Sequence, residues 1–431
     1  MKKLYNAAII MHTGECLFHK DMYIEAGRIV RICDSGTPQP ELIPSDTIDC
    51  SAYFVSPGLV NLHAHTAMNI FKGIAEDVPP EIWFNEMIWP YESKMTKQDI
   101  YTGTVLGIAE MINNGVTAAA DHYFGEEQVL QAAKDTGMRM DIAPTVFGIA
   151  PNFRDRLAQV SEFIRNHQED SSRISLRFGP HSDYTCPGNT LAEIVAEAKK
   201  MQLPIHLHLS ETQLQVEQSL QRTGKTPFRC LYDAGGFDLP VLIAHGLWVT
   251  EDDLGCINEN TWFAFCPKTY MRLASGRGGF FDLANRLQYS FGSDGAASSG
   301  TVNPLEQARL FAMLEKFNQN DAVIYPFIEI WQKLMAGHAV FGAGTGKIEE
   351  NAAADLVIWN LQTPDTMAYY HPVSAILYGA GSSNVRYTMV EGEFLKYDGV
   401  LKMNFDEIAQ EAMRLQKNLL ARGKGKAEVY Y

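Results

Sequence analysis

Residues 57–73, PGLVNLHAHTAMNIFKG, place two histidines one residue apart at the end of an apolar run. Because side chains alternate between the two faces of a strand, His63 and His65 should point one way while Leu62 and Ala64 point the other. Two imidazoles on one face can bind a metal ion, or they can be polar side chains on a solvated sheet face. The pair alone does not decide between these interpretations.

Other residues able to bind a metal or to transfer a proton also stand at the ends of apolar runs. They are His181 in SLRFGPH, His206 and His208 in PIHLHLSE, Glu211 just after it, His245 in VLIAH and Asp294 in SFGSD. Three or four nitrogen and oxygen ligands with an open position are typical of a catalytic divalent metal ion. The pattern favours four ligands: His63, His65, His208 and Asp294. Glu211 and His245 could move protons beside such an ion, whereas His206 lies deeper and is expected to be a hydrogen-bonded core residue.

The elements that must position these residues alternate between apolar strands and amphipathic helices from residue 57 onward. Helices are expected over 99–115 and 155–167, among others, and eight strands are expected between 57 and 294. Such alternation implies a parallel sheet, and about eight units in roughly 250 residues suggest a closed barrel, whose catalytic residues lie at the carboxyl ends of the strands. An open doubly wound sheet is the alternative architecture, but no G-x-G-x-x-G follows the first strand.

Both ends of the chain are rich in short strand-like segments separated by Gly and Pro. We expect them to pair into one small β-sandwich domain formed by residues 1–56 and 347–431, beside a catalytic barrel of residues 57–346. The fold class is therefore predicted to be α/β. The last amphipathic stretch, 405–423, is expected to be a helix with a packing role.

Composition narrows the possible partners and the location. The chain has 51 acidic and 36 basic residues and a formal charge of −15, which disfavours binding to nucleic acid or to an anionic membrane surface. Seven scattered cysteines without a C-x-x-C pair favour a reducing cytoplasm over a disulfide framework or a cysteine zinc site. No signal-peptide core or apolar run of about 20 residues is found, so we expect a cytoplasmic protein.

Taken together, the motifs resemble those of the amidohydrolase superfamily, in its branch of aromatic-base deaminases and triazine hydrolases. The stretches similar to 5′-methylthioadenosine/S-adenosylhomocysteine deaminases are GIAEDVPPEIWFNEMIWPYESKMT (73–96), GPHSDYTC, HLHLSET, IAHG and GSDGAASS. The likeness extends over nearly the whole chain. It implies a TIM-type (β/α)8 barrel and hydrolytic deamination of an adenine nucleoside, of the 5′-methylthioadenosine, S-adenosylhomocysteine or adenosine type, to the inosine analogue and ammonia.

The resemblance also implies a metal centre and roles for the residues around it. One divalent ion is expected, zinc with iron or manganese as alternatives, and the segment RISLRFGPH lacks the lysine that would bridge a second ion. The implied ligands are His63, His65, His208 and Asp294. In the implied reaction Glu211 protonates a ring nitrogen, while His245 and Asp294 help to activate water and to reposition the proton.

Four substrate contacts are implied in the same way: Trp83, Glu92, Arg156 and His181. A carboxylate that accepts two hydroxyl groups suits a ribose, so Glu92 favours a nucleoside over a free base. Three of these residues also have a simpler interpretation. Trp83 could pack in the core, Glu92 could be a surface charge, and Arg156 could pair with a neighbouring acid such as Asp155 or Glu162. The adjacent Asp121 and His122, after the second strand, are interpreted as structural or supporting residues.

The sequence departs from the family pattern in several places. These are Asp183, the segment CPKTYMRL with Lys268, Thr269 and Tyr270, and Pro144, where some relatives carry a second arginine for a charged substrate tail. Alternative functions are the same scaffold acting on a free base, a pterin or an s-triazine, and a non-catalytic relative that binds or assembles. A homo-oligomer is expected because barrels of this family are often dimers or tetramers.

Overall fold

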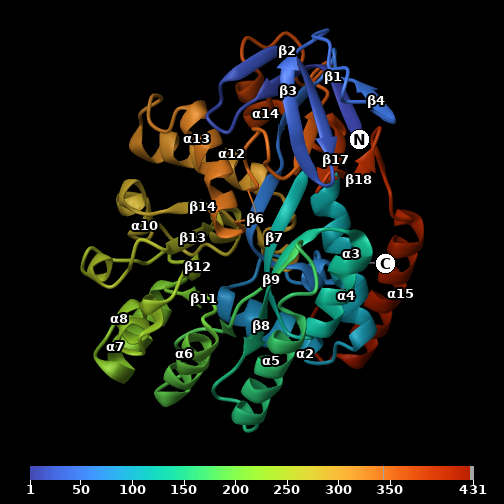
Figure 1. Cartoon of the computed structure of the whole chain (residues 1–431). Helices are drawn as coiled ribbons and strands as arrows, with labels where there is room; N and C mark the ends of the chain where they lie inside the picture. Colours follow the sequence, from blue (N-terminus) through green and yellow to red (C-terminus); the bar gives the residue numbers. More distant parts are fainter. Residues whose placement is uncertain (343, 428–431) are drawn as a thin grey trace.

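Eight strand positions of the central region run parallel around a common centre in the computed structural model, which describes residues 1–342 and 344–427 (Figure 1). In chain order they are β6 (Leu59–His65), β7 (Val116–Tyr123), β8 (Arg139–Val146), β9 with β10 (Ile174–Leu176 and Gly179–Pro180), β11 (Ile205–Leu209), β12 (Val241–His245), β13 (Thr261–Phe265) and β14 with β15 (Tyr289–Phe291 and Asp294–Gly295). The β-branched, aromatic and alanine residues of these segments are almost all buried, as expected of strands covered on both faces.

The strands form two sheets that are joined into one ring. Their orders are β10-β8-β7-β6-β15 and β11-β12-β13-β14, with β9 paired to β8. Parallel bridges between Phe178 and Ile205, and between Ser182 and His208, connect the first sheet to β11. On the other side, β14 continues within four residues into β15, which belongs to the first sheet. The predicted (β/α)8 barrel is therefore confirmed.

Closure of the ring brings the first and last strands together. Asp294 of β15 pairs with Ala64 of β6. Earlier on β6, the side-chain amide of Asn61 donates its N–H to Ser293 Oγ at 2.7 Å, and its side-chain oxygen accepts from Ser293 N at 2.9 Å. The two residues are 232 positions apart in the sequence. All of these groups are buried, so the contact is a polar seam inside the barrel wall.

An apolar cluster fills the inside of the ring below the polar end. Its buried members come from strands that are not all neighbours, so they meet across the barrel centre: Val60, Leu62, Ala118, Ala120, Leu242 and Ala264. Small alanines on β7 and β13 leave room for the larger side chains, as close packing requires. The polar residues that follow on the same strands consequently lie on a closed apolar floor.

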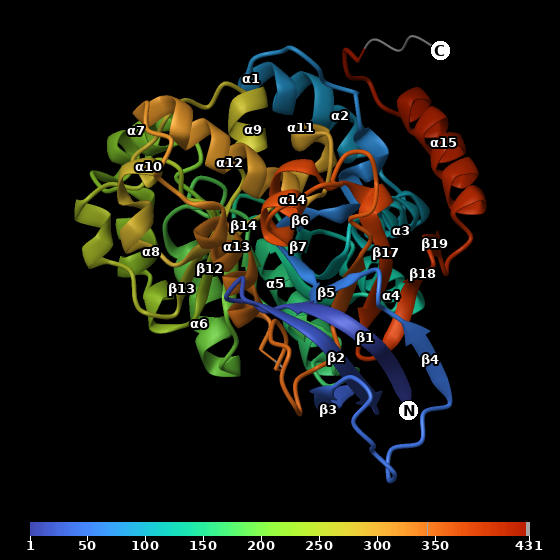
Figure 2. The ribbon, with the colours of Figure 1, turned by 90° about the horizontal axis from the view of Figure 1, so that it is seen from above.

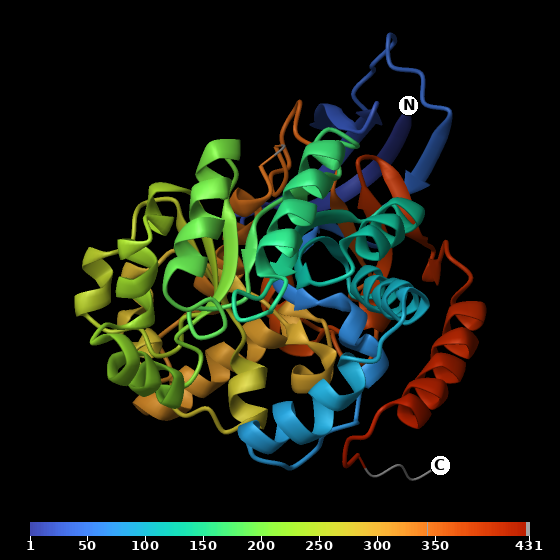
Figure 3. The ribbon, with the colours of Figure 1, turned by 90° about the horizontal axis from the view of Figure 1, so that it is seen from below.

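Helices cover the outside of the ring. The longer ones are α3 (Lys97–Asn113), α4 (Glu126–Thr136), α5 (Phe153–His167), α6 (Asn189–Met201), α7 (Gln213–Thr223), α8 (Pro227–Asp233), α12 (Pro304–Gln319) and α13 (Phe327–Ala336). Figures 1 and 3 show α5 and α6 side by side on this outer layer. The predicted helices 99–115 and 155–167 are α3 and α5, and α3 begins at a capping box between Thr96 and Asp99.

Short helical segments stand between the barrel strands, some after the carboxyl ends of strands and others, such as those just before β12 and β14, near their amino ends. They are η1 (Thr66–Phe71), α1 (Pro80–Ile82), the π-helical η2 (Trp83–Ile88), α2 (Trp89–Glu92), η3 (Gly236–Asp238), η4 (Asp252–Gly255), α9 (Pro267–Arg272), α10 (Phe280–Leu283), η5 (Ala284–Arg286), α11 (Ala296–Ser299) and η6 (Gly337–Val340). Most are only one turn long, so packing against the barrel must hold them in place.

Both ends of the chain contribute to one nine-stranded sheet beside the barrel. Its strands are β1 (Lys2–Ile10), β2 (Cys16–Glu25), β3 (Arg28–Asp34), β4 (Asp46–Asp49), β5 (Phe54–Pro57), β16 (Leu356–Trp359), β17 (Val385–Val390), β18 (Glu393–Tyr397) and β19 (Val400–Leu401). Antiparallel pairing of β5 with β16 joins the two ends, and Figure 1 shows β1–β4 next to β17 and β18. The domain limits at residues 56 and 346 stay a prediction.

The remaining helices belong to the C-terminal part. They are α14 (Pro372–Gly379), η7 (Ser382–Asn384) and α15 (Phe405–Arg422). Figure 2 shows α15 along the outside of the molecule next to α3, and its buried side chains Ala412, Leu415 and Leu419 give it the expected packing face. None of the helices in the described residues is long and apolar enough to span a membrane. All seven cysteines are free thiols.

A buried ion pair joins the barrel to the terminal sheet and gives a stability prediction. Arg139 of β8 donates to Asp355 at 2.8 Å and to Glu391 at 3.1 Å, and the side chains of Arg139 and Asp355 are almost fully buried. Arg139→Met leaves the buried Asp355 carboxylate without its cation, so we expect the free energy of unfolding in urea to fall by about 3–5 kcal/mol. The exposed pair of Arg154 with Glu193 provides the control: Arg154→Met should leave the free energy of unfolding nearly unchanged. Equal losses in the two variants would contradict this account.

Candidate functional site

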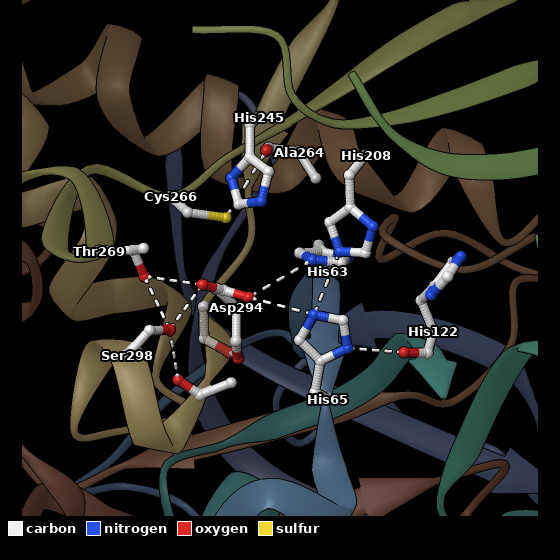
Figure 4. Close-up of polar contacts among 12 residues, drawn as sticks. His63, His65, His122, His208, His245, Ala264, Cys266, Thr269, Asp294 and Ser298 are labelled. Carbon is white, nitrogen blue, oxygen red and sulfur yellow. Dashed lines mark hydrogen bonds and ion pairs between the residues drawn. The ribbon is translucent and has the colours of Figure 1, made fainter. Parts of the chain in front are cut away.

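Three histidines and one aspartate converge at the carboxyl end of the barrel (Figure 4). Asp294 Oδ1 lies 3.3 Å from His65 Nε2 and 3.6 Å from His63 Nε2. His65 Nε2 lies 3.2 Å from His208 Nε2. The donor atoms of His63, His65 and His208 form one group within 4.8 Å, and those of His63, His245 and Asp294 form a second. The structure thus brings together the four residues predicted as metal ligands.

A break in strand pairing explains how two successive histidines of β6 reach this point. The register between β6 and β7 shifts between Asn61 and Ala64. Because of this shift, Leu62 packs into the apolar floor inside the barrel, although simple alternation predicted that it points away from the centre. The rings of His63 and His65 then lie 4.7 Å apart, edge to face, at the polar end. The prediction that Leu62 faces outward was wrong, and the bulge is the reason.

Backbone carbonyls orient two of the imidazoles. His65 Nδ1 lies 2.6 Å from the carbonyl oxygen of His122, and His208 Nδ1 lies 2.8 Å from that of His181. A carbonyl only accepts, so Nδ1 is the donor in both rings and Nε2 carries the lone pair in the neutral imidazole. Both lone pairs therefore face the shared space.

These distances test whether a metal ion fits. Two nitrogen lone pairs 3.2 Å apart repel each other unless a proton or a cation lies between them. Ligand bonds of about 2.0–2.1 Å in a tetrahedral site place neighbouring ligand atoms about 3.3–3.4 Å apart. The separations of 3.2, 3.3 and 3.6 Å agree with that spacing. His63 Nε2 is also buried without a hydrogen-bond partner. The residues fit a divalent metal ion.

The electrostatics of the cluster call for positive charge at the same place. Burial alone would raise the pKa of Asp294, but contacts with His63 and His65 outweigh it and hold the pKa well below its ordinary value. Burial alone would lower the pKa of His65, but the Asp294 carboxylate raises it to about 9. Burial, together with the charge of His65, lowers the pKa of His208 to about 3. In the protein without metal, one proton therefore occupies the position that suits a cation.

Two groups suited to proton transfer stand beside this cluster. Burial and the nearby Asp294 carboxylate raise the pKa of Glu211, which lies just before α7. Burial lowers the pKa of His245 to about 4, and its Nε2 lies 3.7 Å from Glu211 Oε1. His245 and Asp294 both have left-handed backbone conformations, with φ of 70° and 61°, which turn their side chains inward at the strand ends. The arrangement provides a carboxyl group and a neutral imidazole next to a candidate metal ion.

Supporting contacts to Asp294 were not foreseen from the sequence. Ser298 Oγ donates to Asp294 Oδ2 at 2.5 Å, and Thr269 Oγ1 lies 3.1 Å from the same oxygen. They fix the carboxylate so that Oδ1 faces the histidines. Thr269 stands in the segment that departs from the family pattern, and Ser298 stands in the motif GSDGAASS, so position in a motif was the only available signal. Tyr270, from the same segment, lies with its hydroxyl 3.3 Å from His245 Nδ1.

Two further departures, Asp183 and Lys268, form ion pairs. Asp183 is buried and accepts from Arg222 at 2.8 Å. Lys268 donates to Glu306 at 2.7 Å and to the Thr301 hydroxyl at 3.1 Å. Asp121 accepts from the backbone and the hydroxyl of Thr66 at 2.7 Å, which agrees with its interpretation as a structural residue.

A cavity opens from the cluster toward the short helices after β6. His65, His208, Glu211, His245 and Asp294 line its inner end. Of the predicted substrate contacts, the structure places three in its wall: Trp83, Glu92 and His181. Glu92 is buried, which raises its pKa, and it accepts from the Tyr123 hydroxyl at 2.6 Å. The simpler interpretation of Glu92 as a surface charge is therefore wrong.

Arg156 is not among the lining residues of this cavity. Its guanidinium binds both oxygens of Glu126, at 2.7 and 2.8 Å, and its Nη2 also lies 3.3 Å from the carbonyl oxygen of Thr145, which does line the cavity. The acid that pairs with it comes from α4 and not from the neighbouring positions 155 or 162. The structure thus places Arg156 behind the wall, and its role as a substrate contact stays a prediction.

The hydrogen bond between the two deepest histidines gives a prediction on metal affinity. His206 Nε2 lies 3.0 Å from His63 Nδ1, as expected for a hydrogen-bonded core histidine. It fixes the ring that exposes Nε2, so His206→Phe should weaken metal binding by about 10- to 100-fold. Titration of the metal-free protein with zinc measures the effect. His167→Phe, on the outside of α5, should leave the affinity unchanged. An unaltered affinity in His206→Phe would show that the strand alone orients His63.

The closed barrel and the four converging ligands define a metal-dependent barrel hydrolase. Residues 54–395 match the Amidohydrolase family, and the chain belongs to this family. It is 32% identical over 427 residues to a protein of Desulforudis audaxviator named 5-methylthioadenosine/S-adenosylhomocysteine deaminase, covering 97% of this chain and 99% of that one. A protein of the same name from Pyrococcus furiosus is 31% identical, covering 95% and 99%.

Solved structures show the same fold. A zinc-bound adenosine deaminase from Xanthomonas campestris has a TM-score of 0.92 at 24% identity, covering 97% of this chain and 98% of that one. Zinc-complexed atrazine chlorohydrolase from Arthrobacter aurescens has a TM-score of 0.87 at 19% identity, covering 96% and 100%. At these identities the likeness concerns the fold. Together with the family match and the fitting ligand cluster, it makes this chain a metal-dependent hydrolytic enzyme.

Proposed function

We propose that this enzyme deaminates an adenine nucleoside to the inosine analogue and ammonia. The observation that carries the proposal is the buried Glu92 carboxylate in the wall of the cavity that leads to the metal-ligand cluster. Tyr123 uses one of the hydrogen bonds that this carboxylate can accept, so further acceptor capacity remains for the two hydroxyls of a ribose. The names of the full-length relatives support the same substrate class.

We propose zinc as the metal ion, held by His63, His65, His208 and Asp294. Imidazole and carboxylate ligands at these spacings suit zinc, and the adenosine deaminase with the same fold has bound zinc. A divalent ion at this position lowers the pKa of water toward neutrality and so supplies a nucleophile for hydrolysis.

The residues of the chain then handle the protons. Glu211, whose raised pKa favours the protonated form, gives its proton to the ring nitrogen next to the carbon that bears the amino group. Its carboxylate afterwards takes the proton of the hydroxyl group that has been added to that carbon and delivers it to the amine, so that ammonia leaves as the carbonyl group forms. The proton released when water ionises restores Glu211 to its starting state. His245 is neutral and holds the attacking water by hydrogen bonding. Contacts with His63 and His65 lower the pKa of Asp294 and so keep this carboxylate ionised. His181, in the cavity wall, contacts the base.

We also propose a location and an assembly for the enzyme. Seven free thiols suit a reducing cytoplasm. The acidic balance disfavours nucleic acid and anionic membranes as partners, beside the small-molecule substrate proposed above. The homo-oligomer stays a prediction. Size-exclusion chromatography with light scattering measures it directly, and a monomer at micromolar concentration would contradict it.

Glu92→Gln tests the nucleoside assignment. Replacement of the carboxylate by an amide weakens charge-assisted hydrogen bonds to both ribose hydroxyls, so kcat/KM for 5′-methylthioadenosine should fall by about 10- to 100-fold. Turnover of a substrate without ribose should not change. The control is Glu86→Gln, in the same segment, whose side chain pairs with Lys426 at 2.5 Å. Ammonia release from a free base, a pterin or an s-triazine, with none from adenine nucleosides, would overturn the proposal in favour of those substrates.

A further inference from the structure

The outer end of the cavity is aromatic. Its wall there contains Trp83, Phe84, Trp89, Phe147 and Tyr184. The rings of Phe84 and Trp89 stack at 6.1 Å, and Trp89 meets Phe147 edge to face at 6.4 Å. Phe84 and Trp89 are also 38% and 42% exposed, whereas Glu211 and Asp294 are largely covered. This aromatic end is therefore the mouth, opposite the metal ligands.

The metal ligands at one end of the cavity and the aromatic rings at the other determine how a nucleoside can be oriented in it. Its base must reach Glu211 and Asp294 for deamination, and its ribose must reach Glu92, which lies between. The substituent on the 5′ carbon is then directed toward the aromatic mouth, because that is the remaining open end of the cavity. The chemistry of the mouth consequently selects the 5′ substituent.

The mouth offers no free cation to a charged substituent. Among the described residues that line the cavity, none is lysine or arginine. Two arginines contact the backbone of lining residues from behind. Arg156 is bound by both oxygens of Glu126, and Arg272, which donates to the carbonyl oxygen of Ser298 at 2.8 Å, is paired with Glu76. Both of these arginines already have a carboxylate partner.

The cavity also carries acidic groups of its own in Glu92, Glu211 and Asp294. A carboxylate on the substrate would lose its hydration in an aromatic mouth without gaining a cation, and it would face these acids. A thioether methyl group loses little hydration there and gains contact with the rings, since sulfur packs well against aromatic edges.

We propose that the enzyme is selective for adenine nucleosides whose 5′ substituent is uncharged and apolar, such as methylthio, and that it discriminates against those with an amino-acid tail, such as S-adenosylhomocysteine. This inference rests on the proposed deaminase function and narrows it. It departs from the names of the relatives, which include both compounds. The basis is the aromatic mouth without a cation.

The zinc-loaded enzyme tests the proposal through kcat/KM for 5′-methylthioadenosine, adenosine and S-adenosylhomocysteine, measured as ammonia release. We expect methylthioadenosine to exceed S-adenosylhomocysteine by about 100-fold or more, because the site leaves a carboxylate unpaired. Calorimetric titration of the Glu211→Gln variant with the same compounds should show the same order of affinity without turnover. Equal values for the two compounds would overturn this inference while the deaminase function stands. Failure of all three nucleosides to react would overturn the deaminase function itself.

A charge introduced at the mouth separates electrostatics from shape. Trp89 is well exposed, so Trp89→Arg and its neutral match Trp89→Gln should both fold. Both lose the ring and should turn over methylthioadenosine more slowly. Only Trp89→Arg should gain activity on S-adenosylhomocysteine relative to methylthioadenosine, by about tenfold over the glutamine variant. An equal ratio of the two activities, S-adenosylhomocysteine to methylthioadenosine, in both variants would show that the missing cation does not cause the substrate preference.

Discussion

Glu211→Gln should lower kcat for deamination by about 100- to 10,000-fold while the zinc content of the protein stays the same. The amide has the size and the hydrogen-bonding reach of the carboxyl group, but it can neither give a proton to a ring nitrogen nor take one up. Glu211 is not one of the four converging ligands, so loss of its charge leaves the donor atoms around the ion in place.

The control for this prediction lies in α7, the helix that follows Glu211. Glu217, which accepts from Gln213 on the exposed side of α7, can be changed to glutamine without an expected effect. The raised pKa of Glu211 also gives a direction: at higher pH the wild-type group loses its proton, so the alkaline fall of kcat should disappear in the variant. A variant that retains most of its kcat would remove Glu211 from the reaction.

Removal of the metal ion should abolish deamination, with a loss of at least about 1,000-fold, and re-addition of zinc should restore it. It should also lower the thermal midpoint. An ion present at 100 times its dissociation constant contributes about 2.7 kcal/mol to the folded state, because it binds the assembled ligands and not the unfolded chain. In the stripped protein, the close approach of His65 and His208 is relieved only by a proton.

The matched variants are His208→Asn, which removes one ligand, and His167→Asn, which changes a histidine on the surface of α5. His208→Asn should purify with little metal and should show no zinc-dependent rise of the thermal midpoint. His167→Asn should behave as the wild type in both measurements. Full activity of thoroughly chelated protein, with metal content verified by mass spectrometry, would disprove the metal-dependent mechanism.

The barrel could be predicted because its signals are local. Apolar runs that end in His or Asp recur along the chain, and most are followed by an amphipathic stretch, so β6, β11 and β12 and helices such as α3 could be placed from periodicity. The terminal sheet was harder to define. The pairing of β5 with β16 joins residues about 300 apart, for which no local pattern exists.

The site shows the same limit at the level of single side chains. His63, His65, His208 and Asp294 could be predicted as a group because barrel geometry brings strand ends to one rim. The bulge in β6 could not be predicted, since it arises from the pairing of this strand with β7. The partner of Arg156 could not be predicted either, because Glu126 on another helix binds this arginine in place of the acids next to Arg156 in the sequence.

The polar seam between Asn61 and Ser293 has a consequence for synthesis of the protein. The first two ligands leave the ribosome early, but Asp294 follows only after more than 200 further residues, and the strand that carries it is the one that closes the ring. A nascent chain that ends before this strand has three imidazoles and no complete coordination shell. The complete set of metal ligands therefore forms only when the barrel closes. The terminal sheet assembles later still, because β5 pairs with β16 near the end of the chain.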